Sequence, residues 1–205
     1  MEELLLMERK YPRTGAKRLG EPTLTAADWA EAALHLVAEA GLRGLTVDAL
    51  AARLGATKGS FYWHFKSRDE LLAAALDRWE QRATAETIKG LDAVPDARRR
   101  LQLMLAAASQ PPRSRSLYTA LAEAAGDRIV RGALNRVASK RIEYLDSCYR
   151  ELGFAQPVAR AKALFAYAAY RGLLQLAHET PSVLPKDWSS YPETVKQALI
   201  PAGRT

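Results

Sequence analysis

One stretch of the sequence gathers residue types that could contact a polar partner. Within residues 58–64 the chain carries a lysine, a serine and three neighbouring ring side chains with polar atoms. The residues expected to face outward there are Lys58, Gly59, Ser60, Tyr62, Trp63 and His64. A globular surface rarely exposes Tyr, Trp and His side by side without a partner. The stretch therefore indicates a binding interface, with the alternative that two of the rings belong to the core.

The sequence contains no recognisable set of catalytic or metal-binding residues. His35, His64 and His178 are isolated along the chain, and neither an HExxH pattern nor a phosphate-binding glycine loop occurs. Cys148 is the single cysteine and has no second thiol for a disulfide or a zinc site. We expect no enzyme, no catalytic residue, no cofactor and no metal. A helical enzyme assembled by tertiary proximity is the alternative from a different class.

The apolar pattern that must position these residues predicts an all-α protein. Apolar side chains recur at helical spacing, and strand-like alternation with turn pairs does not occur. Thr25 and Asp28 have the form of a capping box, which predicts a first helix that ends at Gly41. Ser67 and Glu70 form a second capping box at the start of a long helix to about residue 90. Further helices are expected over residues 95–109, 117–125, 127–152, 157–179 and 194–200.

Two short helices joined at Gly55 have the spacing of a helix-turn-helix. Thr46 can cap the first of them, and Thr57 can cap the second. Ala51 is small where the two helices cross, and Phe61 supplies an apolar plug between them. This geometry presents the outer face of the second helix to a DNA major groove.

Charge alone does not locate the interface. The formal charge is +7, but residues 1–90 carry 13 basic and 13 acidic side chains, whereas residues 91–205 carry 17 and 10. The narrower window of residues 43–68 holds five basic side chains and only one acidic one, Asp48. We interpret the excess of residues 91–205 as solvated surface, with an anionic effector as the alternative. Its arginines include Arg98, Arg99, Arg100, Arg128, Arg131 and Arg136.

The bulk composition excludes several protein classes. With 48% hydrophobic and 26% charged residues, the chain is neither disordered nor membranous by composition. No apolar run approaches the roughly 20 residues that a bilayer span needs. The short run Leu4–Met7 follows two glutamates instead of a basic leader, so we predict no secretory signal, no membrane partner and a cytoplasmic location.

The run Gly-Ala-Thr-Lys-Gly-Ser-Phe-Tyr-Trp-His-Phe-Lys-Ser-Arg-Asp-Glu-Leu at residues 55–71 resembles the TetR family of bacterial regulators. The match extends from Ala33 to Leu72, and the spacing of Gly41, Thr46, Gly55, Tyr62, His64, Phe65 and Leu71 agrees as a set. The resemblance implies a DNA-binding transcriptional regulator. Repression is the commoner outcome in the family. A homodimer binds a palindromic operator, and a small-molecule effector releases the homodimer from the DNA. The alternative is an effector-independent regulator or an architectural DNA-binding protein.

The resemblance also implies which residues contact double-stranded DNA. Thr46 would meet a phosphate, Gly59 would admit the backbone close to a base, and Lys66 would hold the DNA backbone. Lys58 suits guanine O6 and N7, whereas a phosphate contact by Lys66 adds affinity without specificity. The full set of predicted DNA contacts is Thr46, Thr57, Lys58, Gly59, Ser60, Tyr62, Trp63, His64 and Lys66.

The family further implies a helical body for dimerisation and effector binding. We expect a flexible basic arm at residues 1–22, a three-helix DNA-binding domain at 23–68 and a helical domain at 69–205 that begins with a long fourth helix. The predicted dimer interface, with internal packing as the alternative, is Leu164, Phe165, Ala168, Ala169, Gly172, Leu173 and Leu176. The predicted pocket residues, each of which could instead be core, are Trp79, Met104, Tyr118, Tyr144, Tyr167, Tyr170 and His178.

Overall fold

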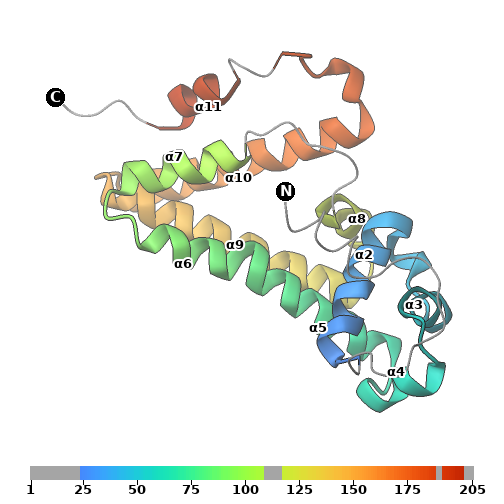
Figure 1. Cartoon of the computed structure of the whole chain (residues 1–205). Coiled ribbons are helices and arrows are strands. Elements are labelled where there is room, and N and C mark those ends of the chain that lie inside the picture. The colour runs from blue at the N-terminus through green and yellow to red at the C-terminus, as the bar shows by residue number, and fades with distance from the viewer. Residues whose placement is uncertain (1–23, 109–116, 188–190, 201–205) are drawn as a thin grey trace. The chain divides into compact units, whose positions relative to one another are not determined.

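The computed structural model describes residues 24–108, 117–187 and 191–200, and every regular element among them is helical (Figure 1). The predicted all-α fold is confirmed. The arm expected at residues 1–22 lies outside the described residues. Among the helices that the structure describes, none is both long enough and apolar enough to span a bilayer.

The described chain divides into two compact units. The first comprises residues up to Trp79 together with Ala120–Ala133, and the second comprises Glu80–Thr119 together with the residues from Leu134 onward. This division differs from the boundary expected at residue 68. The next helix groups with the first unit, and its apolar side chains Leu71, Leu72, Ala75 and Leu76 are buried.

The first unit contains the three helices expected before residue 68. They are α2 (Ala26–Gly44), α3 (Val47–Leu54) and α4 (Lys58–His64), and α5 (Arg68–Glu80) follows them. The capping box of α2 is present, since Asp28 N donates to Thr25 Oγ1 at 3.3 Å and Thr25 N donates to Asp28 Oδ2 at 2.9 Å. The first regular helix ends at Gly41 as predicted, because Gly41 is non-helical (ψ 178°). Gly41 takes φ 71° and breaks the regular helix, but residues 42–44 add a further helical turn.

Side-chain caps and one left-handed glycine set the helix-turn-helix. Thr46 Oγ1 accepts from Ala49 N at 3.1 Å, and Thr57 Oγ1 accepts from Ser60 N at 3.2 Å, so α3 and α4 begin where the sequence predicts. Between them Gly55 adopts φ 61° and ψ 30°, a conformation that a side chain with a Cβ disfavours. The two short helices are therefore held in one relative orientation by local chemistry.

Phe61 fixes α4 against the rest of the first unit. Its side chain is fully buried, and its ring lies edge-on to Trp29 of α2 with centroids 5.5 Å apart. The Phe65 ring lies 5.9 Å from the Phe61 ring. A helix of seven residues is not stable alone in water, so tertiary packing must hold it.

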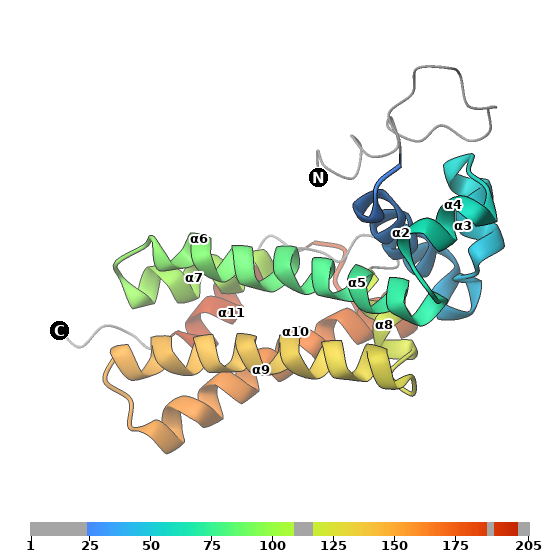
Figure 2. The same ribbon diagram turned by 90° about the horizontal axis from the view of Figure 1, so that it is seen from below.

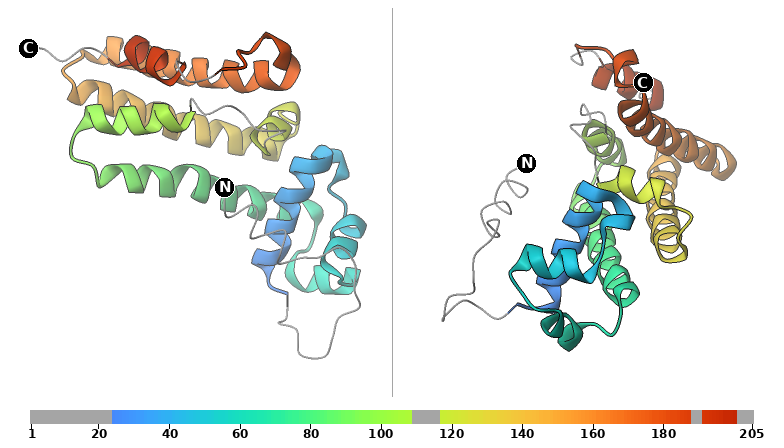
Figure 3. Two further views of the ribbon diagram at one scale, coloured as in Figure 1. Left: turned by 45° about the horizontal axis from the view of Figure 1, so that its top comes forward. Right: turned by 90° about the vertical axis from the view of Figure 1, so that its right-hand side faces the viewer.

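The second unit is a bundle of longer helices around its own core. A π-helical segment, η1 (Gln81–Glu86), continues α5 into α6 (Thr87–Asp92). The remaining helical elements of the described chain are α7 (Ala97–Ala108), α8 (Leu117–Glu123), α9 (Arg128–Glu151), α10 (Gln156–Glu179), η2 (Pro181–Val183) and α11 (Tyr191–Leu199). In Figure 2 the long helix α10 passes across α9 at an angle, and Figure 3 shows the two helices from two further directions. A cluster that includes Leu101, Tyr149 and Ala163 fills the core, and the Tyr149 hydroxyl donates to the Leu199 carbonyl at 2.8 Å.

Replacing Phe61 with alanine should unfold the first unit, whereas the same change at Trp63 should not. The Phe61 cavity is expected to cost about 3–5 kcal/mol. Trp63 is 88% exposed, so its loss should change stability by no more than about 0.5 kcal/mol. Urea unfolding followed by far-ultraviolet circular dichroism measures both. Equal losses of stability in the two variants would contradict the assignment of Phe61 as the plug.

Candidate nucleic-acid interface and ligand cavity

The outer side of α4 presents the polar and aromatic residues that the sequence singled out. Tyr62 is 60% exposed and Trp63 is 88% exposed, so the alternative in which two of the three rings are core is wrong. Ser60 and His64 are half-buried. The exposed predicted contacts are Thr46, Thr57, Lys58, Gly59, Tyr62, Trp63 and Lys66. The structure thus places the predicted residues along α3, α4 and the turn after α4.

Gly59 has no internal reason to be glycine. A Cβ at this position would meet only Thr57 Oγ1, at an ordinary 3.6 Å. Gly44 differs, because a Cβ there would lie 2.5 Å from Ala40 Cβ. Gly59 therefore leaves open space on the α4 surface for another molecule to approach the backbone closely.

Lys58, the predicted base-reading residue, is ion-paired in the free chain. Its Nζ lies 2.6 Å from Asp48 Oδ1 of α3, and both side chains are exposed. The hydrogen bond to Asp48 raises the pKa of Lys58 above its usual range, so the ammonium stays charged. A DNA contact by Lys58 must therefore compete with a carboxylate that would itself repel phosphates.

Other basic residues near α4 are structural. Arg53 forms a bidentate pair with Glu39, with both nitrogen–oxygen distances 2.7 Å. The guanidinium of Arg68 donates to the Leu45 carbonyl at 2.8 Å and to the Leu42 carbonyl at 2.9 Å. These bonds hold the end of α2 to the start of α5. The positive surplus of residues 43–68 is consequently much smaller at the surface than in the sequence.

The second unit contains a cavity of about 410 Å³. Ligand pockets in proteins usually occupy about 300–1,000 Å³. Among the predicted pocket residues, Met104, Tyr167 and Tyr170 line it. The other lining residues are Ala83, Thr84, Thr87, Ile88, Gly90, Leu91, Leu103, Leu105, Arg141, Leu145 and Ala166.

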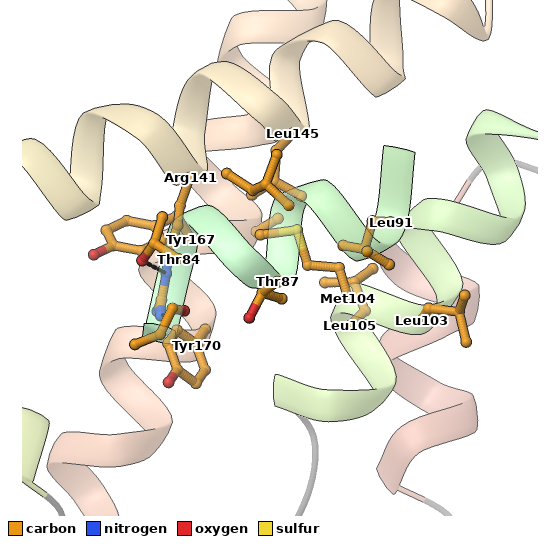
Figure 4. Close-up of a pocket in the computed structure, with 14 residues that line it drawn as sticks. Thr84, Thr87, Leu91, Leu103, Met104, Leu105, Arg141, Leu145, Tyr167 and Tyr170 are labelled. Carbon is orange, nitrogen blue, oxygen red and sulfur yellow. Dashed lines mark hydrogen bonds between the residues drawn. The ribbon is translucent and has the colours of Figure 1, made fainter. Parts of the chain in front are cut away.

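The cavity has a polar end and an apolar end (Figure 4). Arg141, Thr84, Tyr167 and Tyr170 gather at one end, and Leu91, Leu103 and Leu105 gather with Met104 at the other. Arg141 is the single charged residue among the lining residues. The Tyr167 hydroxyl lies 3.1 Å from the Tyr118 hydroxyl, and burial raises the pKa of Tyr167, so this hydroxyl stays protonated.

The other predicted pocket residues do not line the cavity. Trp79 is buried in the first unit, Tyr144 and Tyr118 lie among the second unit's packed side chains, and His178 is exposed. Sequence reasoning missed Arg141 and the helical row Thr84, Thr87 and Leu91. One helical turn separates neighbouring members of that row, which was a usable signal. Nothing in the sequence showed that Arg141 points toward them.

Cations of α9 bind the π-helical segment and the residue before it. The buried Glu80 carboxylate accepts from Arg136 Nε at 2.7 Å and from Lys140 Nζ at 2.6 Å. Burial alone would raise the pKa of Glu80, but these two bonds outweigh it, so the pKa is lowered and the carboxylate stays ionised. Arg141 donates to Thr84 Oγ1 at 3.2 Å and to the Ala83 carbonyl at 2.8 Å. π-helical segments occur frequently at functional sites.

The interpretation of the arginine excess as solvated surface needs correction at Arg100. Arg100 is buried and donates to the Val94 carbonyl at 2.8 Å and the Pro95 carbonyl at 3.0 Å. It also pairs with Glu151. Arg136 binds Glu80 as described above. Arg100 needs these acceptors because its guanidinium is buried, whereas the side chain of Arg136 is half exposed while it pairs with Glu80.

The α10 surface carries most of the predicted dimer residues. Phe165 is 64% exposed and Leu164 is 47% exposed. Ala168, Ala169, Gly172 and Leu176 are exposed as well, whereas Leu173 is buried within the chain itself. Leu173 therefore belongs to the internal side of α10. A Cβ at Gly172 would meet nothing within 4 Å, so no packing inside the chain requires glycine there.

The family comparison confirms the resemblance inferred from residues 55–71. Residues 30–75, from α2 through most of α5, match the model of the bacterial regulatory proteins of the tetR family. This segment contains all of α3 and α4 and the predicted DNA contacts. No curated protein is significantly similar to the chain in sequence.

Solved structures with a similar fold include transcriptional regulators. A transcriptional regulator from Rhodococcus sp. Rha1 is 22% identical, with a TM-score of 0.69 over 86% of this chain and 96% of that one. Reduced NemR from E. coli is 17% identical, with a TM-score of 0.73 over 89% and 100%. AibR, solved with isovaleryl coenzyme A and operator DNA, is 16% identical, with a TM-score of 0.63 over 86% and 98%.

Replacing Asp48 with asparagine should strengthen DNA binding about two- to fivefold, the scale of an exposed ion pair. The change frees Lys58 and removes a negative charge from the face that α4 presents. Titration of labelled duplex DNA by fluorescence anisotropy at a fixed salt concentration measures the effect. Asp77→Asn, which removes the same charge from α5, is the control. An unchanged or weakened affinity for Asp48→Asn would show that this pair does not oppose binding.

Proposed function

We propose that this chain, a DNA-binding regulator of the TetR family, represses transcription as a homodimer on a palindromic operator and is released by a small molecule in the second unit. The observation that carries the proposal is the exposure of Tyr62 and Trp63 on a helix whose opposite side is held by buried Phe61. A short helix with one anchored face and one exposed polar and aromatic face suits entry into a major groove.

Different residues on and beside the α4 face contact bases and phosphates. Lys58 lies in the first turn of α4 and provides a donor for guanine edges, while exposed Gly59 allows the backbone to approach a base. Thr46 and Lys66 flank the face and can meet phosphates, which positions the protein without reading sequence. One such face contacts too few base pairs for selectivity, so two copies about 34–36 Å apart are the usual solution.

The exposed stripe of α10 supports the dimer. Val158, Phe165, Gly172 and Leu176 are exposed at intervals close to whole numbers of helical turns and so share one side of the helix. Exposed apolar stripes of this kind are typical of interaction surfaces. Gly172 weakens an isolated helix by about 1 kcal/mol relative to alanine, and close approach of a second helix explains its presence.

The cavity supports control by an effector over the effector-independent alternative. AibR, a solved structure of the same fold, holds an acyl coenzyme A together with operator DNA. In this chain, cavity residues Thr84, Thr87 and Leu91 lie on η1 and α6, which continue α5 without a break in helical backbone. Arg68, at the start of α5, is bonded to the end of α2. A ligand that shifts η1 can therefore act on the α4 face through one continuous segment of chain.

Selection of bound fragments from random duplex DNA tests the proposal. An enriched inverted repeat is expected, and absence of any enriched sequence would contradict a specific operator. In competition binding to the selected site, Lys58→Ala should reduce discrimination against mismatched sites, because one base contact is worth about 1–3 kcal/mol. Lys66→Ala should instead weaken binding to all sequences alike and lower the salt dependence. Identical effects of the two variants would contradict this division of roles.

Replacing Phe165 with glutamate should convert the dimer to a monomer. The substitution places a charge on the exposed α10 stripe, and a charge desolvated at an interface without a partner is strongly unfavourable. Sedimentation velocity at micromolar concentration measures the mass. Arg160→Glu, an exposed site on the same helix, is the control. A dimer that persists in Phe165→Glu, or a monomeric unmodified protein, would refute the α10 interface.

A further inference from the structure

We infer that the cavity of the second unit selects an amphipathic monocarboxylate, whose carboxylate Arg141 binds and whose apolar chain lies along the leucine end. This inference rests on the proposed function, because it names the chemical class of the effector for the same cavity. It is carried by one contrast within the lining: a single charge at one end and apolar side chains at the other (Figure 4).

Arg141 has donor capacity to offer a ligand. Its Nε and Nη2 donate to Thr84 and Ala83, but within the described residues Nη1 has no hydrogen-bond partner and no carboxylate pairs with the guanidinium. Glu80, the residue before η1, already binds Arg136 and Lys140. A half-buried guanidinium without a counter-ion favours an anion, and its planar donors match a carboxylate.

Neighbouring groups complete a polar end around Arg141. The Tyr167 and Tyr170 rings lie beside it, with the Tyr170 ring centroid 6.0 Å from the guanidinium carbon. Thr84 and Thr87 add hydroxyl groups to the lining. No lining residue carries a negative charge, so a cationic ligand would meet only repulsion from Arg141.

Among the described residues, the opposite end of the cavity has no polar side chain that could bind a second polar group of the ligand. Leu91, Leu103 and Leu105 are joined there by Met104, whose unbranched side chain adapts to varied apolar shapes. A polar group placed among these side chains would lose its hydrogen bonds to water without replacement. The lining therefore favours one charged head and one apolar tail over a ligand that is polar throughout.

Carboxylate binding also suggests how a ligand in the cavity changes the hydrogen bonds of η1. The Arg141 donors that a carboxylate would use adjoin those that hold the Ala83 carbonyl and the Thr84 hydroxyl. A bound carboxylate competes with these acceptors, so η1 loses bonds from α9 when the ligand arrives. The π-helical segment is then stabilised in its present geometry by fewer hydrogen bonds.

Isothermal titration calorimetry with three ligands of equal chain length tests the inference. Octanoate should bind at least tenfold more tightly than 1-octanol, and octylamine should bind least. Arg141→Gln should reduce the ratio of octanoate to octanol affinity to near one while octanol binding persists. Arg141→Lys, which keeps the charge, should retain part of the preference, and thermal unfolding checks that both variants fold. Arg131→Gln, an exposed arginine on the same helix, should leave all three affinities unchanged.

The outcomes separate this inference from the proposed function. Equal binding of octanoate and octanol, or tightest binding of octylamine, would overturn the carboxylate assignment while leaving the cavity as an effector site. Ala166→Trp fills the cavity and should abolish binding of every ligand. If no ligand binds the unmodified protein, or if Ala166→Trp does not affect binding, effector control through this cavity fails as well. DNA selection and Lys58→Ala are unaffected by either result.

Discussion

The packing of Phe61 against Trp29 is the contact on which the proposed DNA-binding surface depends. Helix α4 has seven residues and cannot persist alone, so the buried ring is what gives its outer face a fixed orientation. Caps at Thr46 and Thr57 and the left-handed Gly55 then set where α3 and α4 begin and turn. Exposure of Tyr62 and Trp63 follows from this arrangement, because the inward positions are already filled.

Ion pairs and hydrogen bonds within the protein limit how many cations on this surface are available to attract DNA. Arg53 and Arg68 are committed to Glu39 and to carbonyls of α2, and Lys58 is shared with Asp48. Affinity for DNA is therefore expected to come from few free cations and from the shape of the α4 face. Such an arrangement favours base contacts over sequence-independent attraction, which is the balance that a selective regulator needs.

The second unit uses its cations differently. Arg136, Lys140 and Arg141 lie within two turns of α9 and bind Glu80, Ala83 and Thr84, where a π-helical segment lines the cavity. Arg100 holds the start of α7 through backbone carbonyls. The positive excess of residues 91–205 thus has structural roles inside this unit as well as solvated ones.

Local patterns in the sequence determined the helical fold and the α3–α4 motif, because caps, glycine turns and helical periodicity act between residues close along the chain. The same patterns identified Lys58, Tyr62 and Trp63, since Phe61 and Phe65 filled the inward positions. They did not reveal the pairing of Lys58 by Asp48. The tertiary structure alone decided which side chains line the cavity, because Arg141 and Thr84 are distant in sequence and meet only when α9 packs on η1. It also decided that Leu173 is buried while Phe165 is exposed, since apolar residues on both sides of α10 look alike until neighbouring helices cover one side.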